Sequence, residues 1–583
     1  MKAFLRTLLA VITAIIFFIV VIVIIVAIST REKAPDIEDN SYLLITLESG
    51  LKEYPPQKDL PTIFEGEGES LHRVLENLRK AAVDDRIDGV IFKIDGYSDY
   101  PANIEEIRYA IDECKNAGKK VYAYSTIMNR GAYFLAAACD SIFVPPSCYF
   151  NFTGFSASAP FIKGSLEKMG IQAELSKIKD YKSAAEMLLE DKWTEPAREN
   201  REWLLEERWN TFVEIVGNDR GLTEEQLTNA MQHALFSGEP DNLIEYGLID
   251  GVAFWDEIKL RLNLDEREDD EYEENERLVT SATYANVDQE DLDLVGDKKI
   301  AVVHAEGSIF GKKSGYDPLW GQTMGYETIN KNLRKALEDE DVAAIVFRIN
   351  SGGGDGMVSD MISRQIEIIT KKKPVVISMV GVAASGGYEI AYKGSKLLAN
   401  RSTYTGSIGS ISGKFMMKEL YNKLGITWDF VSRGPNALIY SDYHNFTDEE
   451  WERFTNNHWV HFNVWLEDVA KYRGMTFEEA ELLAHGRVWT GEQAAENGLI
   501  DEVGGLMQAV NVAKQLAEIP ADEMVTMTHY PEKKSFSEML MSGGGPLGSY
   551  INYKIHNYFT ETLTQRLEVM QQGRWRYWDE EVK

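Results

Sequence analysis

A serine stands at the end of an apolar segment in the C-terminal half of the chain, in the sequence GVAASGGYEIA. Ser385 is expected where a buried strand turns into a helix, with the backbone N–H of Gly386 free beside it. One strand earlier, a glycine run from Gly352 to Gly354 also lies between a strand and a helix. Neighbouring parallel strands end at one edge of a sheet, so Ser385 and the N–H groups of Gly353 and Gly386 could face one carbonyl group.

Each of these features has a simpler explanation when it is taken alone. A serine at a strand-to-helix turn can cap the helix, and a glycine run can be a plain turn. Only their coincidence at one sheet edge favours a nucleophile beside an oxyanion hole, which is the arrangement that acyl-transfer chemistry requires.

Several other kinds of site are excluded by the sequence. No HExxH occurs, and His458 and His461 stand three apart without a nearby acidic ligand pattern, so they favour packing over metal binding. The glycine run lacks both the Gly-Lys-Ser/Thr of a phosphate loop and the GxGxxG spacing. Ala383 replaces the first glycine of a GxSxG elbow. The three cysteines form no CxxC pair. The sequence therefore specifies no metal and no cofactor.

The composition describes a large, acidic, globular chain. Of its 583 residues, 61 are Lys or Arg and 93 are Asp or Glu, which gives a formal net charge of −32. A surface this acidic repels phosphate backbones, so nucleic acid is not expected as a partner. The hydrophobic fraction of 44% is ordinary for folded proteins, and the length calls for more than one domain.

An internal repeat gives the organisation of the chain. Residues 77–95, NLRKAAVDDRIDGVIFKID, align with residues 332–350, NLRKALEDEDVAAIVFRIN, at a constant offset of 255 residues. The register continues without a gap to Tyr133 and Tyr388. In each copy, helices alternate with continuous apolar strands, which is typical of a parallel sheet covered on both faces. The expected fold class is α/β, built as a tandem duplication.

The N-terminus predicts a membrane anchor. The segment from Leu8 to Ile28 is 21 residues long and carries no charge, which is enough to span a bilayer as a helix. A cleaved secretory signal is the alternative, because a small-x-small site follows at Ala27–Ser29. Lys2 and Arg6 precede the segment without any acid, and they favour a cytoplasmic N-terminus.

These patterns divide the chain into five parts. We expect a cytoplasmic tip and anchor at 1–30, an N-terminal α/β repeat at 41–262, an acidic linker at 263–296, a C-terminal α/β repeat at 297–530 and an amphipathic tail at 531–583.

Four segments together resemble the signal peptide peptidase A family in its long, duplicated form. They are NSGGG at 350–354, ASGGY around Ser385, TGSIG at 405–409 and DYKSAAE around Lys182. The resemblance covers nearly the whole chain. It implies a Clp-protease/crotonase-like fold, a membrane-anchored homotetramer, and cleavage of apolar leader peptides at the outer, periplasmic side of a bacterial inner membrane.

The same resemblance implies a role for each site residue. Ser385 is the nucleophile, Lys182 the general base, and Ser407 a hydroxyl that orients the lysine. Gly353 and Gly386 supply the oxyanion hole. The family commonly has Ser-Pro-Gly-Gly at the glycine turn, and here Gly352 replaces the proline. The alternatives are a non-catalytic membrane-anchored scaffold and a crotonase-like acyl-transfer enzyme.

The repeat comparison supports this division of roles independently. At the constant offset Ser385 corresponds to Arg130, so the first copy has no nucleophile. Lys182 corresponds to Ala437, so the second copy has no base, although a surface lysine is the simpler reading of Lys182 alone. The site must therefore form between copies. We expect Lys182 of one chain to meet Ser385 of a neighbouring chain, with contact inside one chain as the alternative.

Overall fold

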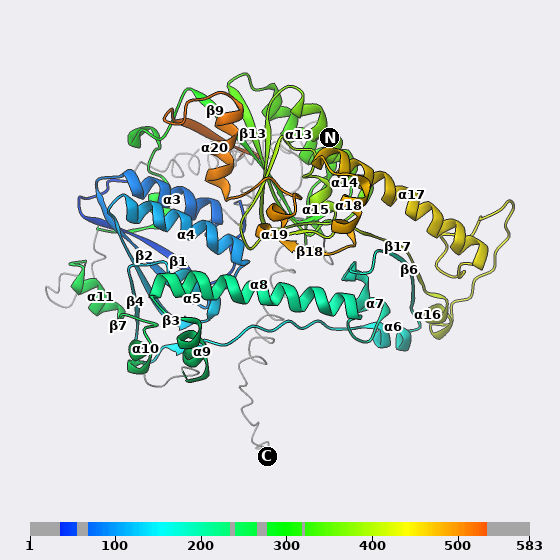
Figure 1. Cartoon of the computed structure of the whole chain (residues 1–583), viewed down its shortest axis with the longest axis horizontal. Helices are drawn as coiled ribbons and strands as arrows, with labels where there is room; N and C mark the ends of the chain where they lie inside the picture. Colours follow the sequence, from blue (N-terminus) through cyan, green and yellow to red (C-terminus); the bar gives the residue numbers. More distant parts are fainter. Residues whose placement is uncertain (1–34, 55–67, 234–239, 265–276, 318–320, 533–583) are drawn as a thin grey trace, which may run out of the picture. The chain divides into compact units, whose positions relative to one another are not determined.

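The computed structural model describes residues 35–54, 68–233, 240–264, 277–317 and 321–532 (Figure 1). The anchor predicted at Leu8–Ile28 lies outside these ranges, as do the acidic run 265–276 and residues 533–583 of the tail predicted at 531–583. None of the helices that the structure describes is both long enough and apolar enough to cross a membrane.

The N-terminal repeat is built on a parallel sheet. In the described part of this repeat, seven strands pair in the order β7-β4-β3-β2-β1-β8, with β5 also beside β3. The strands are β1 (Ser41–Leu47), β2 (Ile87–Asp95), β3 (Lys120–Met128), β4 (Ser141–Val144), β5 (Tyr149–Phe150), β7 (Gly251–Val252) and β8 (Leu278–Thr280). The helices are α3 (Leu71–Val83), α4 (Pro101–Asn116), α5 (Arg130–Ala136), α9 (Glu224–His233), α10 (Asp241–Glu245), α11 (Trp255–Arg261) and α12 (Ser281–Tyr284).

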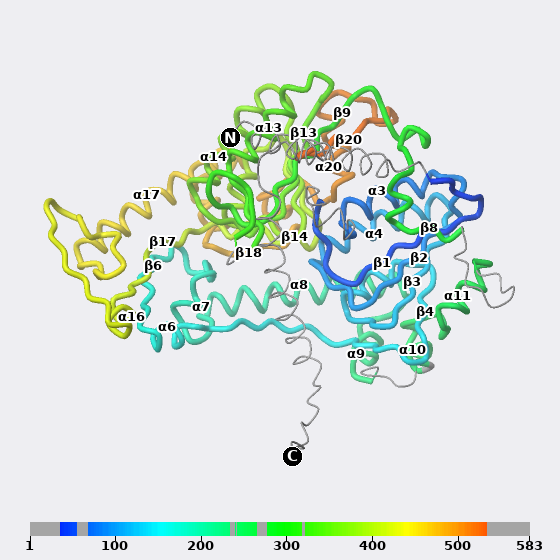
Figure 2. Tube along the Cα trace, turned by 180° about the vertical axis from the view of Figure 1, so that it is seen from behind, coloured from blue at the N-terminus to red at the C-terminus, as the bar shows by residue number. Residues whose placement is uncertain are grey.

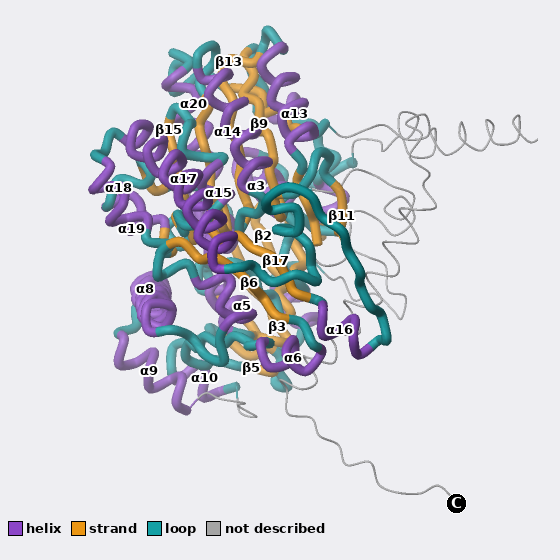
Figure 3. The backbone as a smooth tube through the Cα atoms, turned by 90° about the vertical axis from the view of Figure 1, so that its right-hand side faces the viewer, coloured by secondary structure: helices purple, strands orange, loops and turns teal. Residues whose placement is uncertain are grey.

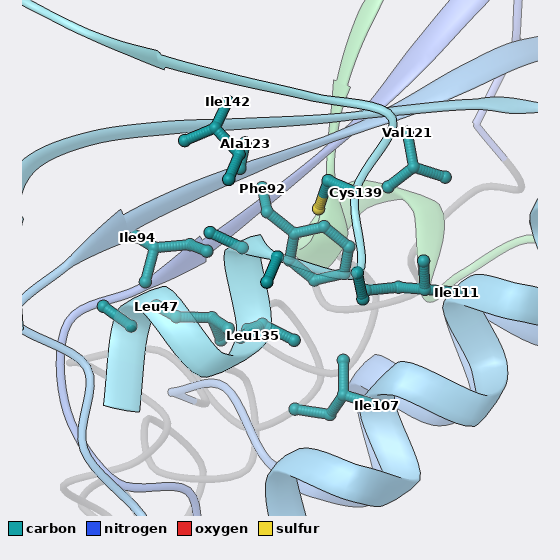
Figure 4. Close-up of a cluster of buried hydrophobic side chains, with 14 of the residues drawn as sticks. Leu47, Phe92, Ile94, Ile107, Ile111, Val121, Ala123, Leu135, Cys139 and Ile142 are labelled. Carbon is teal, nitrogen blue, oxygen red and sulfur yellow. The ribbon is translucent and has the colours of Figure 1, made fainter. Parts of the chain in front are cut away.

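The core of this repeat lies between the sheet and the helices α4 and α5. The middle of its central strand β2 is apolar and buried from Val90 to Phe92, because both faces of the strand are covered there. Figure 4 shows the side chains that meet there. They are Leu47, Phe92, Ile94, Val121, Ala123 and Ile142 of the sheet, Ile107 and Ile111 of α4, Leu135 of α5, and Cys139 after it.

Part of the predicted linker is ordered structure, which corrects the sequence analysis. Strand β8 pairs with β1, and the side chain of Tyr284 in α12 is fully buried. The Tyr284 hydroxyl donates to Asp84 at 3.0 Å, and Lys80 Nζ donates to the Tyr284 carbonyl at 3.0 Å. The densest acidic run ends before Arg277, and Leu278 to Thr280 directly after it extend the sheet.

The C-terminal repeat is built on a second, mostly parallel sheet. Eight described strands form it, in the order β18-β16-β14-β13-β9-β20; β15 pairs with β14, β19 pairs with β15, and β18 runs antiparallel to β16. The strands are β9 (Lys298–Glu306), β13 (Val342–Ser351), β14 (Val375–Ala384), β15 (Lys396–Ala399), β16 (Tyr404–Gly406), β18 (Val488–Thr490), β19 (Glu502–Val503) and β20 (Val525–Tyr530). The short strands β10 (Ser308–Ile309), β11 (Gly315–Asp317) and β12 (Gly321–Met324) make a small sheet nearby.

Helices cover both faces of this second sheet. They are α13 (Tyr326–Glu338), α14 (Gly356–Thr370), α15 (Gly386–Glu389), α17 (Asp448–Arg473), α18 (Phe477–Ala484), α19 (Gly491–Glu496) and α20 (Leu506–Leu516), whereas α16 (Lys418–Lys423) has no buried residue. One apolar cluster joins the sheet to α13, α14, α17 and α18, and a separate cluster joins it to α20. The α/β class with parallel sheets, predicted from the alternation of apolar strands and helices, is confirmed.

A buried arginine joins the two repeats. Arg348 in β13 is 1% exposed, and its guanidinium donates to Glu53 and to Glu106 of the N-terminal repeat, at 2.7 Å each. It also donates to Ser378 Oγ at 2.9 Å. Buried charges are stable only when they are paired and hydrogen-bonded, so this network holds the repeats in one arrangement.

A strand exchange provides the second connection. Strand β6 (Gln172–Ile178) follows the N-terminal sheet in sequence but pairs antiparallel with β17 (Ser410–Met416), from Gln172↔Met416 to Ile178↔Ser410 (Figures 2 and 3). His458 of α17 bridges the two strands through the hydroxyls of Ser176, at 2.9 Å, and Ser410, at 2.8 Å. This residue therefore packs, as its sequence context indicated.

A long helix follows β6. Helix α8 (Glu195–Arg220) comes after α6 (Lys163–Met169) and α7 (Glu186–Leu189), and it leads into α9 (Figure 1). Near its start, the Asn200 side chain exchanges two hydrogen bonds of 3.0 Å with the backbone of Val488 in β18. One helix of the N-terminal repeat is thereby attached to the edge of the C-terminal sheet.

We predict that Arg348→Met destabilises the chain by about 3–5 kcal/mol, because the substitution leaves Glu53 and Glu106 buried without a counter-charge. The measurement is the free energy of unfolding from denaturant titration. The matched control is Arg334→Ala, which removes an exposed hydrogen bond to Gln365 and should change stability by less than about 0.5 kcal/mol. Equal effects of the two substitutions would contradict the role given to Arg348.

Candidate active site

Ser385 lies at the turn between β14 and α15, as predicted. Its backbone has φ 57° and ψ −123°, a conformation that a residue with a side chain rarely adopts. Hydrogen bonds hold it there. The Ser385 N–H donates to the Gly406 carbonyl at 2.8 Å, and its own carbonyl accepts from the N–H groups of Tyr388 and Glu389 at 3.0 Å. Backbone strain of this kind concentrates at functional sites.

Lys182 approaches Ser385 from the other repeat of the same chain. It lies in the turn after β6, and its Nζ is 2.8 Å from Ser385 Oγ. The Lys182 Nζ also donates to the Ser407 carbonyl at 2.8 Å and lies 3.1 Å from Ser407 Oγ. The structure thus brings all three predicted polar residues into direct contact.

Two glycines enclose Lys182. Gly486 has φ +75°, and a Cβ added to it would lie 2.4 Å from the Lys182 nitrogen. A Cβ added to Gly409 would lie 3.1 Å from Lys182 Cδ. On either side of this contact, Tyr181 N–H donates to the His485 carbonyl and Gly486 N–H to the Ile408 carbonyl. The backbone at positions 409 and 486 packs so closely against Lys182 that no residue larger than glycine fits at either position.

Burial changes the acidity of the lysine. The Lys182 side chain is 4% exposed, and desolvation lowers its pKa to about 7, against the opposing effect of the Glu389 carboxylate. Burial and the charge of Asp360 in turn raise the pKa of Glu389 to about 8. Near neutral pH the Glu389 carboxyl is therefore mostly uncharged, and a large fraction of Lys182 is a free amine that can accept a proton.

The oxyanion donors differ from the prediction in one position. The Gly353 N–H donates to Ser351 Oγ at 3.1 Å, so it is not free as predicted. In the part of the chain that the structure describes, the N–H groups of Gly354 and Gly386 have no acceptor. A Cβ added to Gly386 would lie 3.1 Å from the Gly354 nitrogen, so these two donors are close together. The free pair of donors is Gly354 with Gly386.

The expectation that the lysine and the serine meet between neighbouring chains is wrong. Both residues belong to one chain, because the β6–β17 pairing carries Lys182 into the C-terminal repeat. The structure instead shows contact between the two copies within one chain, which is the alternative that the sequence left open.

Sequence reasoning missed Gly354, Gly486 and Glu389. Gly354 belongs to the glycine run, in which each backbone N–H was a possible oxyanion donor. Only the hydrogen bond from the Gly353 N–H to Ser351 Oγ shows that Gly354 is the free donor. Gly486 stands in AHGRV with nothing around it that marks a contact with Lys182. Glu389 is four residues after Ser385, which places its carboxylate one helical turn away.

Comparison with known proteins assigns the two repeats to one family. The model of peptidase family S49 matches residues 113–267 and again residues 367–520. Together these ranges span more than half of the chain, and each lies mainly in one repeat. The tandem duplication predicted from the constant offset is therefore confirmed.

Individual proteins agree with this assignment. "Serine protease SPPA, chloroplastic" from Arabidopsis thaliana is 33% identical over 509 residues, covering 87% of this chain and 74% of that protein. "Protease 4" from Haemophilus influenzae is 30% identical and covers 77% of this chain and 73% of its own length. "Putative signal peptide peptidase SppA" from Enterococcus faecium is 30% identical over 221 residues, which are 38% of this chain and 64% of that protein.

We predict that Gly486→Ala lowers peptide hydrolysis at least about tenfold, because the new methyl group displaces Lys182 and small misplacements in an active site have large effects on rate. The measurement is kcat/KM of the full chain on a peptide substrate.

Gly425→Ala is the matched control for this substitution. Gly425 has φ +74°, nearly the same as Gly486, but no atom lies within 4 Å of the added Cβ. The control therefore carries the same backbone strain without the contact. Equal loss of activity in both variants would contradict the role of Gly486.

Proposed function

Because this chain belongs to peptidase family S49, we propose that it is a serine protease that uses Ser385 as nucleophile and Lys182 as general base. The observation that carries the proposal is the 2.8 Å contact between Lys182 Nζ and Ser385 Oγ, made by a lysine that burial shifts toward its neutral form. Lysine with its ordinary pKa of about 10.4 could not accept the serine proton at neutral pH.

The first chemical step is attack on a peptide carbonyl. Neutral Lys182 takes the proton of the Ser385 hydroxyl as Oγ bonds to the carbonyl carbon. The carbonyl oxygen becomes an oxyanion, which the N–H groups of Gly354 and Gly386 stabilise. Ser407 fixes the lysine during this step, since its carbonyl and hydroxyl both contact Nζ.

The second step releases the leaving peptide. The tetrahedral intermediate collapses, the peptide C–N bond breaks, and the ammonium of Lys182 gives its proton to the departing amine. Lys182 is then neutral again and can take a proton from a water molecule that attacks the acyl group on Ser385. The bond from Ser385 Oγ to the acyl carbon then breaks, the ammonium of Lys182 returns its proton to Oγ, and the carboxylic acid is released. A single lysine serves as base and acid in both halves of the reaction.

We propose cleaved signal peptides as the substrates. The resemblance of the sequence motifs to the signal peptide peptidase A family supports this, as does the printed name of the relative from Enterococcus faecium. The proposal includes a membrane anchor at Leu8–Ile28, with the bulk of the chain on the periplasmic side of a bacterial inner membrane, a Clp-protease/crotonase-like fold in each repeat, and assembly of four chains. The uncharged N-terminal segment and the acidic composition of the remainder support the anchored topology.

We predict that Ser385→Ala and Lys182→Ala each reduce kcat/KM at least about 10³-fold, and that the double variant loses no more than either single one, because both residues act in one proton transfer. Lys182→Arg should be equally inactive, since arginine does not lose its proton in the accessible pH range. The measurement is hydrolysis of an apolar peptide by the purified full chain.

Lys192→Ala is the control for the lysine substitutions. Lys192 is an exposed lysine ten residues further along the chain, and its removal should leave hydrolysis unchanged. Substantial activity in Ser385→Ala or Lys182→Ala, with folding verified by the melting curve, would refute the proposed pair.

The pH dependence follows from the lowered pKa of Lys182. The base is the neutral amine, so kcat/KM should rise as pH increases through about 7 and reach a plateau above it. The measurement is kcat/KM from pH 5 to 10. A rise centred on the ordinary lysine pKa of about 10.4 would mean that Lys182 is not desolvated during catalysis.

A further inference from the structure

The N-terminal repeat keeps a pocket at the place where the C-terminal repeat has its nucleophile. The pocket measures about 80 Å³ and is lined by Ser98, Asp99, Arg130 and Gly131. At the offset of 255 residues these correspond to Gly353, Gly354, Ser385 and Gly386. The duplicated site therefore persists in the first copy with an arginine in place of the nucleophile.

Arg130 holds a position in this pocket like that of Lys182 in the other copy. Its Nη1 donates to the carbonyls of Thr153, at 3.3 Å, and Gly154, at 2.5 Å. At the same offset these carbonyls correspond to those of Ile408 and Gly409, directly after Ser407. The guanidinium has further N–H groups, on Nε and Nη2, for which no acceptor exists in the described residues.

A second arginine reaches the same pocket from α8. Helix α5, which begins at Arg130, packs against α8, where the Phe134 and Phe212 ring centroids are 5.8 Å apart (Figure 1). The guanidinium carbons of Arg130 and Arg208 lie 3.9 Å and 5.4 Å from the centroid of the Phe155 ring. Two cations thus converge on one aromatic ring.

Within the described ranges, neither arginine is neutralised by a carboxylate. Burial and the neighbouring charge of Arg208 lower the pKa of Arg130 to about 10, and no acid opposes this shift. The buried Nε of Arg208 has no hydrogen-bond partner in that same part of the chain. Its guanidinium does donate to the hydroxyl of Tyr404, an uncharged partner whose pKa is raised by burial.

The two acids near the pocket are engaged elsewhere. Asp99 accepts hydrogen bonds from the backbone N–H groups of Leu51, at 2.9 Å, and Tyr100, at 2.7 Å, and also from Asn103 and Tyr97. The buried carboxylate of Glu105 accepts from the hydroxyl and the N–H of Ser402. Asp99 lines the pocket as well, but among the described residues neither Asp99 nor Glu105 forms an ion pair with Arg130 or Arg208.

We propose that this pocket binds the C-terminal carboxylate of an apolar peptide through Arg130 and Arg208. A guanidinium matches a carboxylate with two parallel hydrogen bonds, and the rings of Phe134, Phe155 and Phe212 form an apolar wall for the last side chain of the peptide. The choice of a peptide as the ligand rests on the proposed protease function. The charge and shape of the pocket do not depend on that function.

The pocket and the edge strand β18 of the C-terminal sheet both contact α8. Arg208 lies eight residues after Asn200, the residue that binds β18 beside the catalytic strand β16. At about 1.5 Å per residue, the two positions are about 12 Å apart along the helix. A peptide held by its carboxylate would thus be kept near the protease site rather than in it.

Binding of a matched peptide pair tests this proposal. The probes are N-acetyl-Leu-Leu-Phe with a free carboxylate and the same peptide with a C-terminal amide, titrated calorimetrically into the full-length Ser385→Ala variant, which cannot cleave them. We expect the acid to bind about tenfold more tightly than the amide, since a charge-assisted hydrogen bond contributes at least this much. Arg130→Gln and Arg208→Gln, each added to Ser385→Ala, should abolish that preference.

Arg198→Gln is the control on the same helix. Arg198 is an exposed residue of α8 whose ion pair with Glu202 spans 3.6 Å, and its loss should leave the preference for the acid intact. If Arg130→Gln does not give a cooperative melting curve, Arg208→Gln provides the same test, because Arg208 lies in α8 and not in α5.

Three results would overturn the proposal: equal binding of acid and amide, an undiminished preference in folded Arg130→Gln or Arg208→Gln, or tighter binding of inorganic phosphate than of the peptide acid. Failure of the protease assignment would look different. It would appear as missing hydrolysis in the unsubstituted chain, whatever the binding preference.

Discussion

The antiparallel pairing of β6 with β17 is the interaction on which the rest of the site depends. It places a segment of the N-terminal repeat inside the C-terminal one, and Lys182 follows the end of β6 after three intervening residues. Gly413 shows how close the two strands are, because a Cβ there would lie 2.1 Å from the Glu174 carbonyl oxygen. His458 fixes the pair from α17, and the ion pairs of Arg348 fix the repeats that the pair connects. Without the pairing of β6 with β17, Lys182 and Ser385 would belong to separate repeats with nothing to bring them together.

Features that destabilise the fold are concentrated at this one place. Ser385 has a strained backbone, Lys182 is a cationic residue transferred out of water, and the N–H groups of Gly354 and Gly386 have no acceptor among the residues that the structure describes. Each of these raises the free energy of the folded chain by an amount on the order of 1–3 kcal/mol. Such features persist only where the surroundings fix them, and here the surroundings are close backbone contacts at Gly409 and Gly486. In the mechanism that we propose, this energy is recovered in the transition state, where the free donors meet an oxyanion and the neutral amine meets a proton.

Much of the fold could be read from the sequence because the signals were local or repeated. Neighbouring residues are enough to predict the continuous apolar strands, the glycine turn and the position of Ser385. The constant offset between the copies is visible because the sequence itself is repeated. The strand exchange could not be read, because β6 is mostly half-exposed and its sequence QAELSKI carries no strong apolar alternation. The choice between Gly353 and Gly354 depends on a single hydrogen bond from the backbone to Ser351. The strand β8 and the helix α12 within residues 277–296 were not predicted, because the acidic run before them dominates the composition of the segment.

The separation between Lys182 and Ser385, 203 residues along the chain, has a consequence for synthesis. Translation adds about 5–20 residues per second, so about 10–40 s pass between the synthesis of the base and that of the nucleophile. During that interval the emerging chain contains a lysine exposed to water, with the ordinary acidity of its side chain and no serine to activate. The site cannot exist until β17 has been made and has paired with β6. A hydrolase organised in this way is inert while it is being produced, without any propeptide or inhibitor to keep it so.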